Sequence, residues 1–214
     1  MVVRIVIGLI IALILSVSSK AQDCRRCGST PLRWPVRSLS DPDRDKVKFN
    51  RVERESVQSL RARAGDVQEG GSIPTGRIAP FELQVFEIEA YFIGCLKSDR
   101  GAVLYISDEA KPTDSSKKMV GYAVSPECEG ACQSKHVNEF RTVYEQIVGC
   151  SPARYRRFSE PLRVVVKGVG FIPMQHPLRR GGPTITVGLG PLLSIKFIKP
   201  EVIKPKSVTR KRKS

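Results

Sequence analysis

The sequence predicts a mainly β protein of the α+β class, with one helix and a small, curved β-barrel of the OB type as its body. Short apolar-rich segments are separated by turn signals, and one amphipathic helix follows the third of them. The first segment alternates apolar and polar residues with a slip in phase at Val85-Phe86, which is typical of a bulged or strongly curved strand. The order strand-strand-strand-helix-strand-strand fits a small closed barrel.

The chain opens on a segment that we interpret as a secretory signal peptide, residues 1–21. Arg4 supplies a positive start, Ile5–Ser19 is an almost uninterrupted apolar run, and Ser19-Lys20-Ala21 offers small residues at a cleavage site. As a helix the apolar run would span about 22 Å, against roughly 30 Å of hydrocarbon in a bilayer. We therefore expect cleavage near Ala21/Gln22 and export to the periplasm, the cell surface or the medium, rather than an uncleaved anchor.

Residues 22–74 form a predicted N-terminal extension that is irregular and partly helical. Residues 22–40 are an irregular lead-in with prolines around the single tryptophan, Trp34. The stretch Asp43–Arg63 is charged and only weakly periodic, which favours partial helix with little buried face. Glycines and a proline between Gly65 and Pro74 then indicate a flexible link.

The predicted barrel domain covers residues 75–198. Its strands are expected at Phe81–Ile93, Ala102–Ser107, Met119–Val124, Leu162–Ile172, Thr184–Val187 and Leu192–Ile198. The best helix is Lys135–Val148, whose apolar residues recur on one face before Gly149 stops it.

Six cysteines follow the signal segment, an even number that in an oxidising compartment predicts up to three disulfides. The candidates are Cys24, Cys27, Cys95, Cys128, Cys132 and Cys150. Sequence leaves their pairing open, although a straight helix between Cys132 and Cys150 makes those two poor partners. Two alternatives are a redox site at Cys24-x-x-Cys27 and a four-thiolate zinc site that adds Cys128 and Cys132.

Basic residues occur in groups, and the chain has a formal net charge of +15. Arg154, Tyr155, Arg156, Arg157 and Phe158 interleave arginine with aromatics, as in a strip that stacks bases and binds phosphates, and Arg179-Arg180 form a second group. Residues 199–214 are a predicted disordered basic tail that ends in Arg210-Lys211-Arg212-Lys213. This tail would attract a polyanion: an acidic polysaccharide, a nucleic acid or an anionic membrane surface.

No catalytic motif is recognisable in the sequence. The G-x-S-x-G, H-E-x-x-H and P-loop patterns do not occur. His176, in a proline-rich loop, is the better placed of the two histidines, but sequence pairs it with no acid or nucleophile. The sequence therefore favours a binding protein over an enzyme, and we expect neither a cofactor nor a metal site.

Several short motifs run through the predicted barrel domain. They are Arg77–Glu82, Val85–Ile93, Lys97–Asp108, Met119 followed by Pro126-x-Cys128, Gly168-Val169-Gly170-Phe171 and Pro191–Ile195. In these motifs, residues 75–198 resemble an uncharacterised family of exported bacterial proteins with a small OB-like β-barrel. The resemblance implies the fold and export, and it brings no established activity.

Two motifs of that family are degenerate in this chain. Where the family has Asp-Gly-Asp-x-His, the sequence reads Asp99-Arg100-Gly101-Ala102-Val103, and where the family has Glu-x-His-Pro it reads Gly188–Pro191. Only Asp99, and His176 after the Gly-Val-Gly-Phe segment, stay as weak candidates for a catalytic role. The resemblance therefore implies a non-catalytic member whose metal or catalytic ligands, if relatives have them, are mostly lost.

The leading hypothesis is an exported, non-catalytic binding or structural module whose ligand the sequence does not identify. Its basic tail would serve anionic surfaces or polymers. One alternative is a metal-assisted, nuclease-like hydrolase with an altered site. The other is a barrel that binds single-stranded nucleic acid through Arg154–Phe158.

Overall fold

The computed structural model describes residues 24–28, 33–68, 75–114, 117–147, 150, 155–173 and 187–198, without the side chains of 65–68. The predicted signal peptide, the basic tail and the predicted strand Thr184–Val187, except its last residue, lie outside the described residues.

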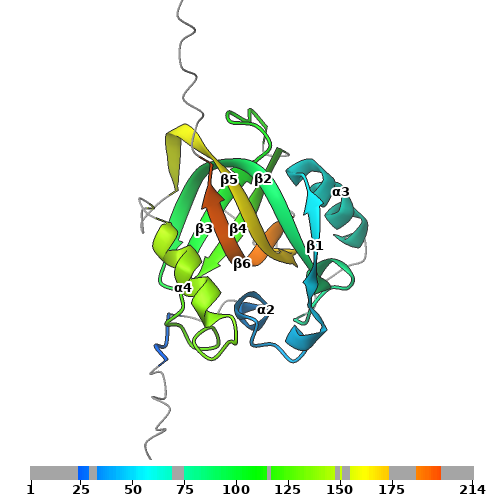
Figure 1. Cartoon of the computed structure of the whole chain (residues 1–214), viewed down its shortest axis with the longest axis vertical. Coiled ribbons are helices and arrows are strands. Elements are labelled where there is room, and N and C mark those ends of the chain that lie inside the picture. The colour runs from blue at the N-terminus through cyan, green and yellow to red at the C-terminus, as the bar shows by residue number, and fades with distance from the viewer. Residues whose placement is uncertain are drawn as a thin grey trace, which may run out of the picture.

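Six strands of the described part of the chain form one mixed sheet that nearly closes into a ring (Figure 1). The strands are β1 (Lys48–Glu55), β2 (Gln84–Ser98), β3 (Gly101–Ser107), β4 (Lys118–Val124), β5 (Arg156–Phe171) and β6 (Gly188–Phe197). Their hydrogen-bonded order is β1-β2-β3-β4-β6-β5, and a further pairing of β5 with β2 closes β2 to β6 into the ring, to which β1 adds beside β2. The β1–β2 and β4–β6 pairs are parallel, and the other pairs are antiparallel. The mainly β class is confirmed, and within residues 75–198 the predicted order strand-strand-strand-helix-strand-strand is confirmed as well.

Alternation along the strands fills the interior of the ring with apolar side chains. Ile88, Ala90 and Phe92 of β2 are buried, as are Leu104 and Ile106 of β3. The register of β2 shifts between Phe92 and Gly94 in its pairings with both β3 and β5, so β2 is bulged later than the predicted slip at Val85-Phe86. This bulge lets one long strand pair with neighbours on both sides as the sheet curves.

Within the described residues, three short helices lie against the sheet. They are α2 (Trp34–Ser38), α3 (Val57–Gln68) and α4 (Val137–Gln146), with single 3-10 turns η1 (Arg44–Lys46) and η2 (Phe81–Leu83). Figure 1 shows α2 and α4 near the same end of the ring, while α3 lies beside β1. The predicted helix at Lys135–Val148 is confirmed as α4, and it buries Phe140 and Val143.

The N-terminal extension is more ordered than the sequence indicates. Within the stretch predicted to be partly helical, Lys48–Glu55 is strand β1, parallel to the start of β2, so the helix prediction is wrong there. It is correct from Val57 onward, but the expectation of little buried face is also wrong, because Val57, Leu60 and Ala64 are fully buried in the core. Both errors arise because contacts with distant parts of the chain decide the local structure. Residues of β1 become a strand by pairing with the edge of β2, and α3 buries its apolar side chains by packing on the ring.

Three disulfides join distant parts of the described chain: Cys24–Cys132, Cys27–Cys128 and Cys95–Cys150. Such a set is typical of an oxidising, extracytoplasmic compartment. The described part of the chain contains no helix that is long and apolar enough to cross a membrane.

Candidate functional site

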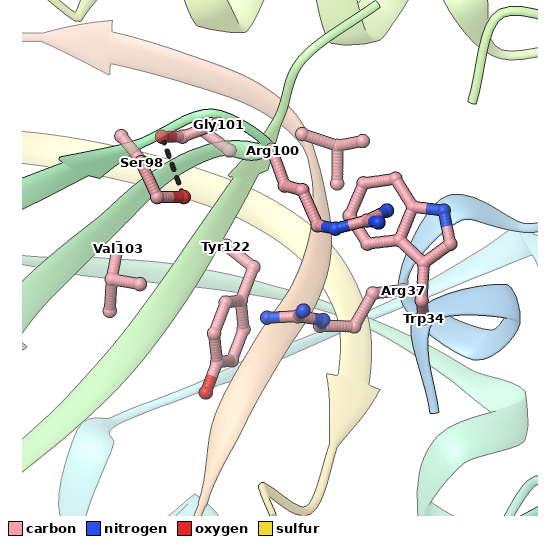
Figure 2. A pocket seen from close by; sticks show the side chains of 10 residues that line it. Trp34, Arg37, Ser98, Arg100, Gly101, Val103 and Tyr122 are labelled. Atoms are coloured by element: carbon pink, nitrogen blue, oxygen red, sulfur yellow. Dashed lines mark hydrogen bonds between the residues drawn. The ribbon is translucent and has the colours of Figure 1, made fainter. Parts of the chain in front are cut away.

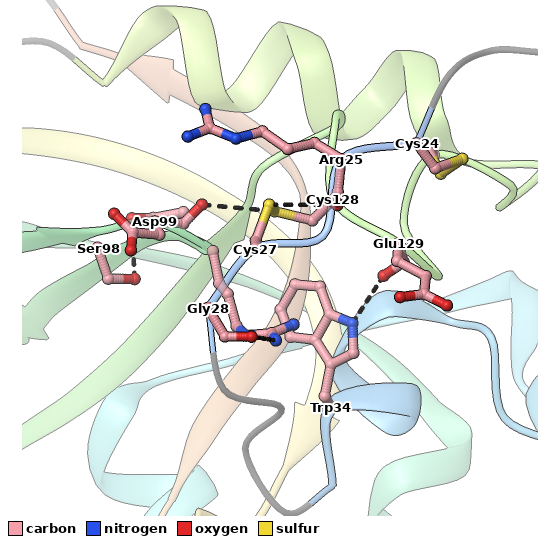
Figure 3. Close-up of a disulfide and its surroundings, with 12 residues drawn as sticks. Cys24, Arg25, Cys27, Gly28, Trp34, Ser98, Asp99, Cys128 and Glu129 are labelled. Carbon is pink, nitrogen blue, oxygen red and sulfur yellow. Dashed lines mark hydrogen bonds between the residues drawn. A yellow bond between two sulfur atoms is a disulfide. The ribbon is translucent and has the colours of Figure 1, made fainter.

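Two disulfides fasten the first described segment, residues 24–28, to the turn after β4. Cys24 and Cys27 bond to Cys132 and Cys128, and between them Arg25 forms a single parallel bridge with Cys128. Figure 3 shows this segment running beside the turn, close to the indole of Trp34. The four sulfurs are brought together as predicted for a zinc site, but they form two disulfides, so the zinc and Cys-x-x-Cys redox alternatives are wrong for this state.

A buried ion pair anchors the chain just before α2. The guanidinium of Arg33 binds the carboxylate of Glu82 through both terminal nitrogens, and both side chains are fully buried. Arg33 also donates to the carbonyl oxygens of Ile172, at 2.7 Å, and Gly76, at 2.8 Å. The Glu82 carboxylate in turn accepts the backbone N–H groups of Ile78 and Ile172. This arrangement fixes the orientation of α2 on the ring of strands.

A second buried pair supports the same contact. Arg77 binds Asp41 through Nε at 2.9 Å and a terminal nitrogen at 2.6 Å, and it also donates to the carbonyl of Val36 in α2. Because both partners of this pair are almost wholly buried, α2 is held from its far end as well.

A small hollow lies where α2 meets the outer face of β3 and β4. We name it the arginine hollow; it is lined by Trp34, Arg37, Ser98, Arg100, Gly101, Ala102, Val103, Tyr122, Ala123 and Val124, and its volume is about 70 Å³. Figure 2 shows Arg37 and Arg100 extending into the space between Tyr122 and Trp34. Whole small molecules need roughly 300 Å³ or more, so the arginine hollow fits one chemical group of a ligand.

Aromatic rings hold the two arginines in this hollow. The Arg37 guanidinium lies 4.7 Å from the ring centre of Tyr122 and 5.5 Å from that of Trp34, while Arg100 lies 4.8 Å from Trp34. The Trp34 indole donates to the carbonyl of Glu129 at 2.8 Å, and Arg100 donates to the carbonyl of Gly28 at 2.9 Å. Cation–π contacts of this kind restrict long side chains without neutralising their charge.

The electrostatics of Arg37 are unusual. Burial lowers the pKa of its guanidinium, the nearby charge of Arg100 lowers it further, and only Tyr122 opposes these effects. Within the described part of the chain Arg37 has no carboxylate partner, and its buried Nε has no hydrogen-bond partner. A desolvated cation without an anion is costly, so the arginine hollow favours an incoming negative group.

The hairpin between β2 and β3 forms the rim of the arginine hollow. Gly101 has φ +135°, and a Cβ at this position would lie 1.9 Å from the carbonyl oxygen of Ala123. Glycine is therefore required at this point. It allows the turn to close against β4 and places Arg100 over Trp34.

Two small or apolar positions flank Tyr122. Val103 lies opposite Tyr122 in the β3–β4 ladder. A Cβ at Gly190 would approach the Tyr122 ring to 3.2 Å.

Asp99 lies on the same hairpin but outside the arginine hollow. It lines a wider depression of about 260 Å³ beside the Cys27–Cys128 disulfide, together with Arg25, Lys97, Glu127 and Tyr144 among others. Acidic and basic side chains both line this depression, so it has no excess of one charge. Among the described residues no group of three or more histidine, cysteine, aspartate or glutamate side chains could hold a metal ion.

Only part of the predicted basic strip lies within the described residues, and not all of that part is exposed. Arg154, His176, Arg179 and Arg180 lie outside the described residues. Tyr155, Arg156 and Arg157 are exposed at the start of β5, whereas Phe158 is half-buried and packs edge-on against Phe92 at 4.9 Å. Phe158 is thus a core contact and does not offer a stacking face.

Sequence reasoning missed the arginine hollow. Trp34, Arg37, Arg100 and Tyr122 are scattered over the chain, and no motif joins them. The available signal was the single tryptophan with arginines one position before and three positions after it, in a segment otherwise interpreted as irregular.

No protein family, curated protein or solved structure matches this chain.

Proposed function

We propose that the protein is an exported binding module with an OB-like barrel, and that it holds an anionic group of its ligand in the arginine hollow. The observation that carries this proposal is Arg37, a desolvated guanidinium fixed between two aromatic rings and left without a carboxylate among the described residues. Arginine presents a planar fork that suits carboxylate, sulfate or phosphate oxygens.

The strand order supports the OB-like interpretation. When β1 is set aside, the ring β2-β3-β4-β6-β5 returns to β2, and α4 lies between β4 and β5. Proteins of the OB fold bind ligands on the face of their second and third strands and on the first hairpin loop. Counted from β2, these elements correspond to β3, β4 and the hairpin around Arg100, which is where the arginine hollow lies.

Export and the basic tail complete the proposal. The predicted signal segment and the three disulfides both agree with an oxidising compartment outside the cytoplasm. From Lys196 onward the sequence has eight lysines or arginines and one acid, so this end attracts polyanions without specificity. The tail would bring the barrel to an anionic surface or polymer, and the arginine hollow would select the group that is bound.

The fluorescence of Trp34 tests the proposal directly, because Trp34 is the single tryptophan and lines the arginine hollow. The full chain is titrated with sodium sulfate and with galacturonate. We expect a saturable change in emission, and Arg37→Ala should weaken binding roughly 10-fold or more, since hydrogen bonds to charged groups contribute about 1.5–3 kcal/mol.

Arg54→Ala is the matched control, because it removes the same charge from a side chain that is 87% exposed on β1. It should leave both titrations unchanged. A second variant, in which Arg210, Lys211, Arg212 and Lys213 are all changed to glutamine, should also bind these small anions like the parent. Equal losses in the Arg37→Ala and Arg54→Ala variants would mean that the anions only screen the overall charge, and would contradict the proposed site.

A further inference from the structure

A row of three tyrosines continues from the arginine hollow along the outer face of the barrel. Tyr122 lies opposite Val103, and Tyr105 is two residues further along β3, so all three residues project from the same face. The ring of Tyr155 meets that of Tyr105 edge-on, with centroids 4.6 Å apart. The row therefore runs from β4 over β3 to the start of β5.

The position of Tyr155 depends on a glycine in the strand below it. Gly94 pairs with Tyr105 in the β2–β3 ladder, and a Cβ at Gly94 would lie 2.7 Å from the hydroxyl oxygen of Tyr155. Without a side chain at this point, the Tyr155 ring can cross β2 and reach Tyr105. Tyr155 is itself 42% exposed, so the row is open at this end.

Positive charge lies at both ends of the row, with neutral phenols between them. Arg37 and Arg100 occupy the arginine hollow, and Arg157 is exposed beside Tyr155. Burial raises the pKa of Tyr105, Tyr122 and Tyr155, so their hydroxyl groups stay protonated at neutral pH and can both donate and accept hydrogen bonds.

The same geometry offers few flat faces for stacked bases. Trp34 is only 5% exposed, and the ring of Tyr122 is covered by Arg37. Tyr105 and Tyr155 contact each other edge-on, and Phe158 is packed against the core. Sugar units suit this surface better than nucleic-acid bases do, because the several hydroxyl groups of each sugar can form hydrogen bonds with the neutral tyrosine hydroxyls.

We propose that an acidic polysaccharide lies along this tyrosine row, with one carboxylate or sulfate group in the arginine hollow and its sugar hydroxyls on Tyr105 and Tyr155. The inference rests on the proposed function for the anionic group, and it adds the class of polymer and the direction in which the polymer runs. A chain of this kind would engage several units at once, so it should bind more tightly than the single sugar acid.

The test uses the full chain with its last four basic residues changed to glutamine, which removes attraction by the tail. Polygalacturonate, galacturonate and an oligodeoxythymidylate are titrated at about 0.15 M salt, where exposed charges are well screened. We expect polygalacturonate to bind at least 10-fold more tightly than galacturonate, per binding site. Tyr105→Phe and Tyr155→Phe should each weaken the polymer roughly 3- to 10-fold and leave the single sugar acid unchanged, because each removes one hydroxyl and keeps the ring.

Tyr144→Phe is the matched control, since Tyr144 lies on α4 and lines the other depression. It should have no effect on any probe. The inference is overturned if the polymer binds no better than galacturonate, or if the two phenylalanine variants bind the polymer like the parent. In either case, loss of binding of both probes in Arg37→Ala would still support the proposed function.

Tight oligodeoxythymidylate binding that Tyr155→Ala weakens and Tyr155→Phe does not would assign the row to nucleic acid instead. Polymer binding that needs the tyrosines but not Arg37 would overturn the proposed function and keep the row as a carbohydrate surface.

Discussion

Arg33 and Arg37 lie four residues apart around α2, and the fold treats their charges in opposite ways. Arg33 is fully buried and binds the Glu82 carboxylate and two carbonyl oxygens. Arg37 is partly buried, and the described residues give it aromatic rings and no carboxylate. The comparison separates an arginine whose charge is compensated inside the fold from one whose charge no carboxylate among the described residues compensates, the residue for which we propose a ligand.

The difference follows from what each side chain meets. Glu82 accepts four hydrogen bonds, two of them from backbone N–H groups, so its charge and that of Arg33 are compensated inside the protein. Among the described residues, no comparable network surrounds Arg37. A protein can tolerate such a residue where the rest of the structure fixes it, and α2 is fixed by the two buried pairs and by the disulfides before it.

The largest expected effect comes from breaking the compensated pair. Glu82→Gln leaves the Arg33 charge buried without an anion, so we expect the free energy of unfolding to fall by about 3–5 kcal/mol. Arg37→Ala should change it by less than about 1 kcal/mol, because it removes a charge that already lacks a partner. Urea unfolding of the oxidised protein, followed by circular dichroism, measures both.

Glu87→Gln is the control for this pair of variants. Glu87 lies on the same strand but pairs with the exposed Arg54, so its loss should cost less than about 1 kcal/mol. Adding Arg33→Met to Glu82→Gln should restore part of the lost stability, because the uncompensated charge is then absent. Similar destabilisation by Glu82→Gln and Arg37→Ala would remove the distinction between the two arginines.

A smaller effect is expected at the hairpin that carries Arg100. Gly101→Ala should lower the free energy of unfolding by about 2 kcal/mol, because it forces alanine into a left-handed region and into contact with the Ala123 carbonyl. Gly76→Ala should change it by less than about 0.5 kcal/mol, since a Cβ at Gly76 would meet nothing within 4 Å. The same unfolding measurement checks both variants, and equal effects would mean that the hairpin can relax without its glycine.

The mainly β class and most strands of the ring could be predicted from the sequence because their signals are local. Alternation in β2 to β4 and the helical spacing in α4 are properties of neighbouring residues, and the turn residues mark the ends. Strand β1 could not be predicted in this way. Its polar sequence KFNRVERE becomes a strand only because the edge of β2 offers it a parallel partner, and the paired residues lie 33 to 36 positions further along the chain.

The residues of the candidate site were not predicted from the sequence. Its net positive charge led us to expect a polyanion as partner, but the basic residues that stand out by clustering lie at Arg154–Phe158, Arg179-Arg180 and the tail. The arginines that form the hollow are single residues on different elements, brought together by α2 and the β2–β3 hairpin. No fixed spacing in the sequence marks this group of residues, because the disulfides and buried ion pairs that hold α2 in place bring them together only in the folded protein.

The smallest expected effect concerns the phenol against which Arg37 lies. Burial raises the pKa of Tyr122 above its ordinary value of about 10, so the folded state keeps the proton where the unfolded state loses it. The stabilisation from this group is therefore complete below pH 10 and is lost as the pH rises through the folded pKa. Tyr122→Phe should make the decline of unfolding free energy above pH 10 shallower than in the parent, and Tyr105→Phe combined with it should flatten the decline further. Equal losses of stability in the parent and in Tyr122→Phe between neutral and alkaline pH would mean that the Tyr122 hydroxyl is solvated. Arg37, which lies against Tyr122, would then also lack the desolvation that distinguishes it from an ordinary surface arginine.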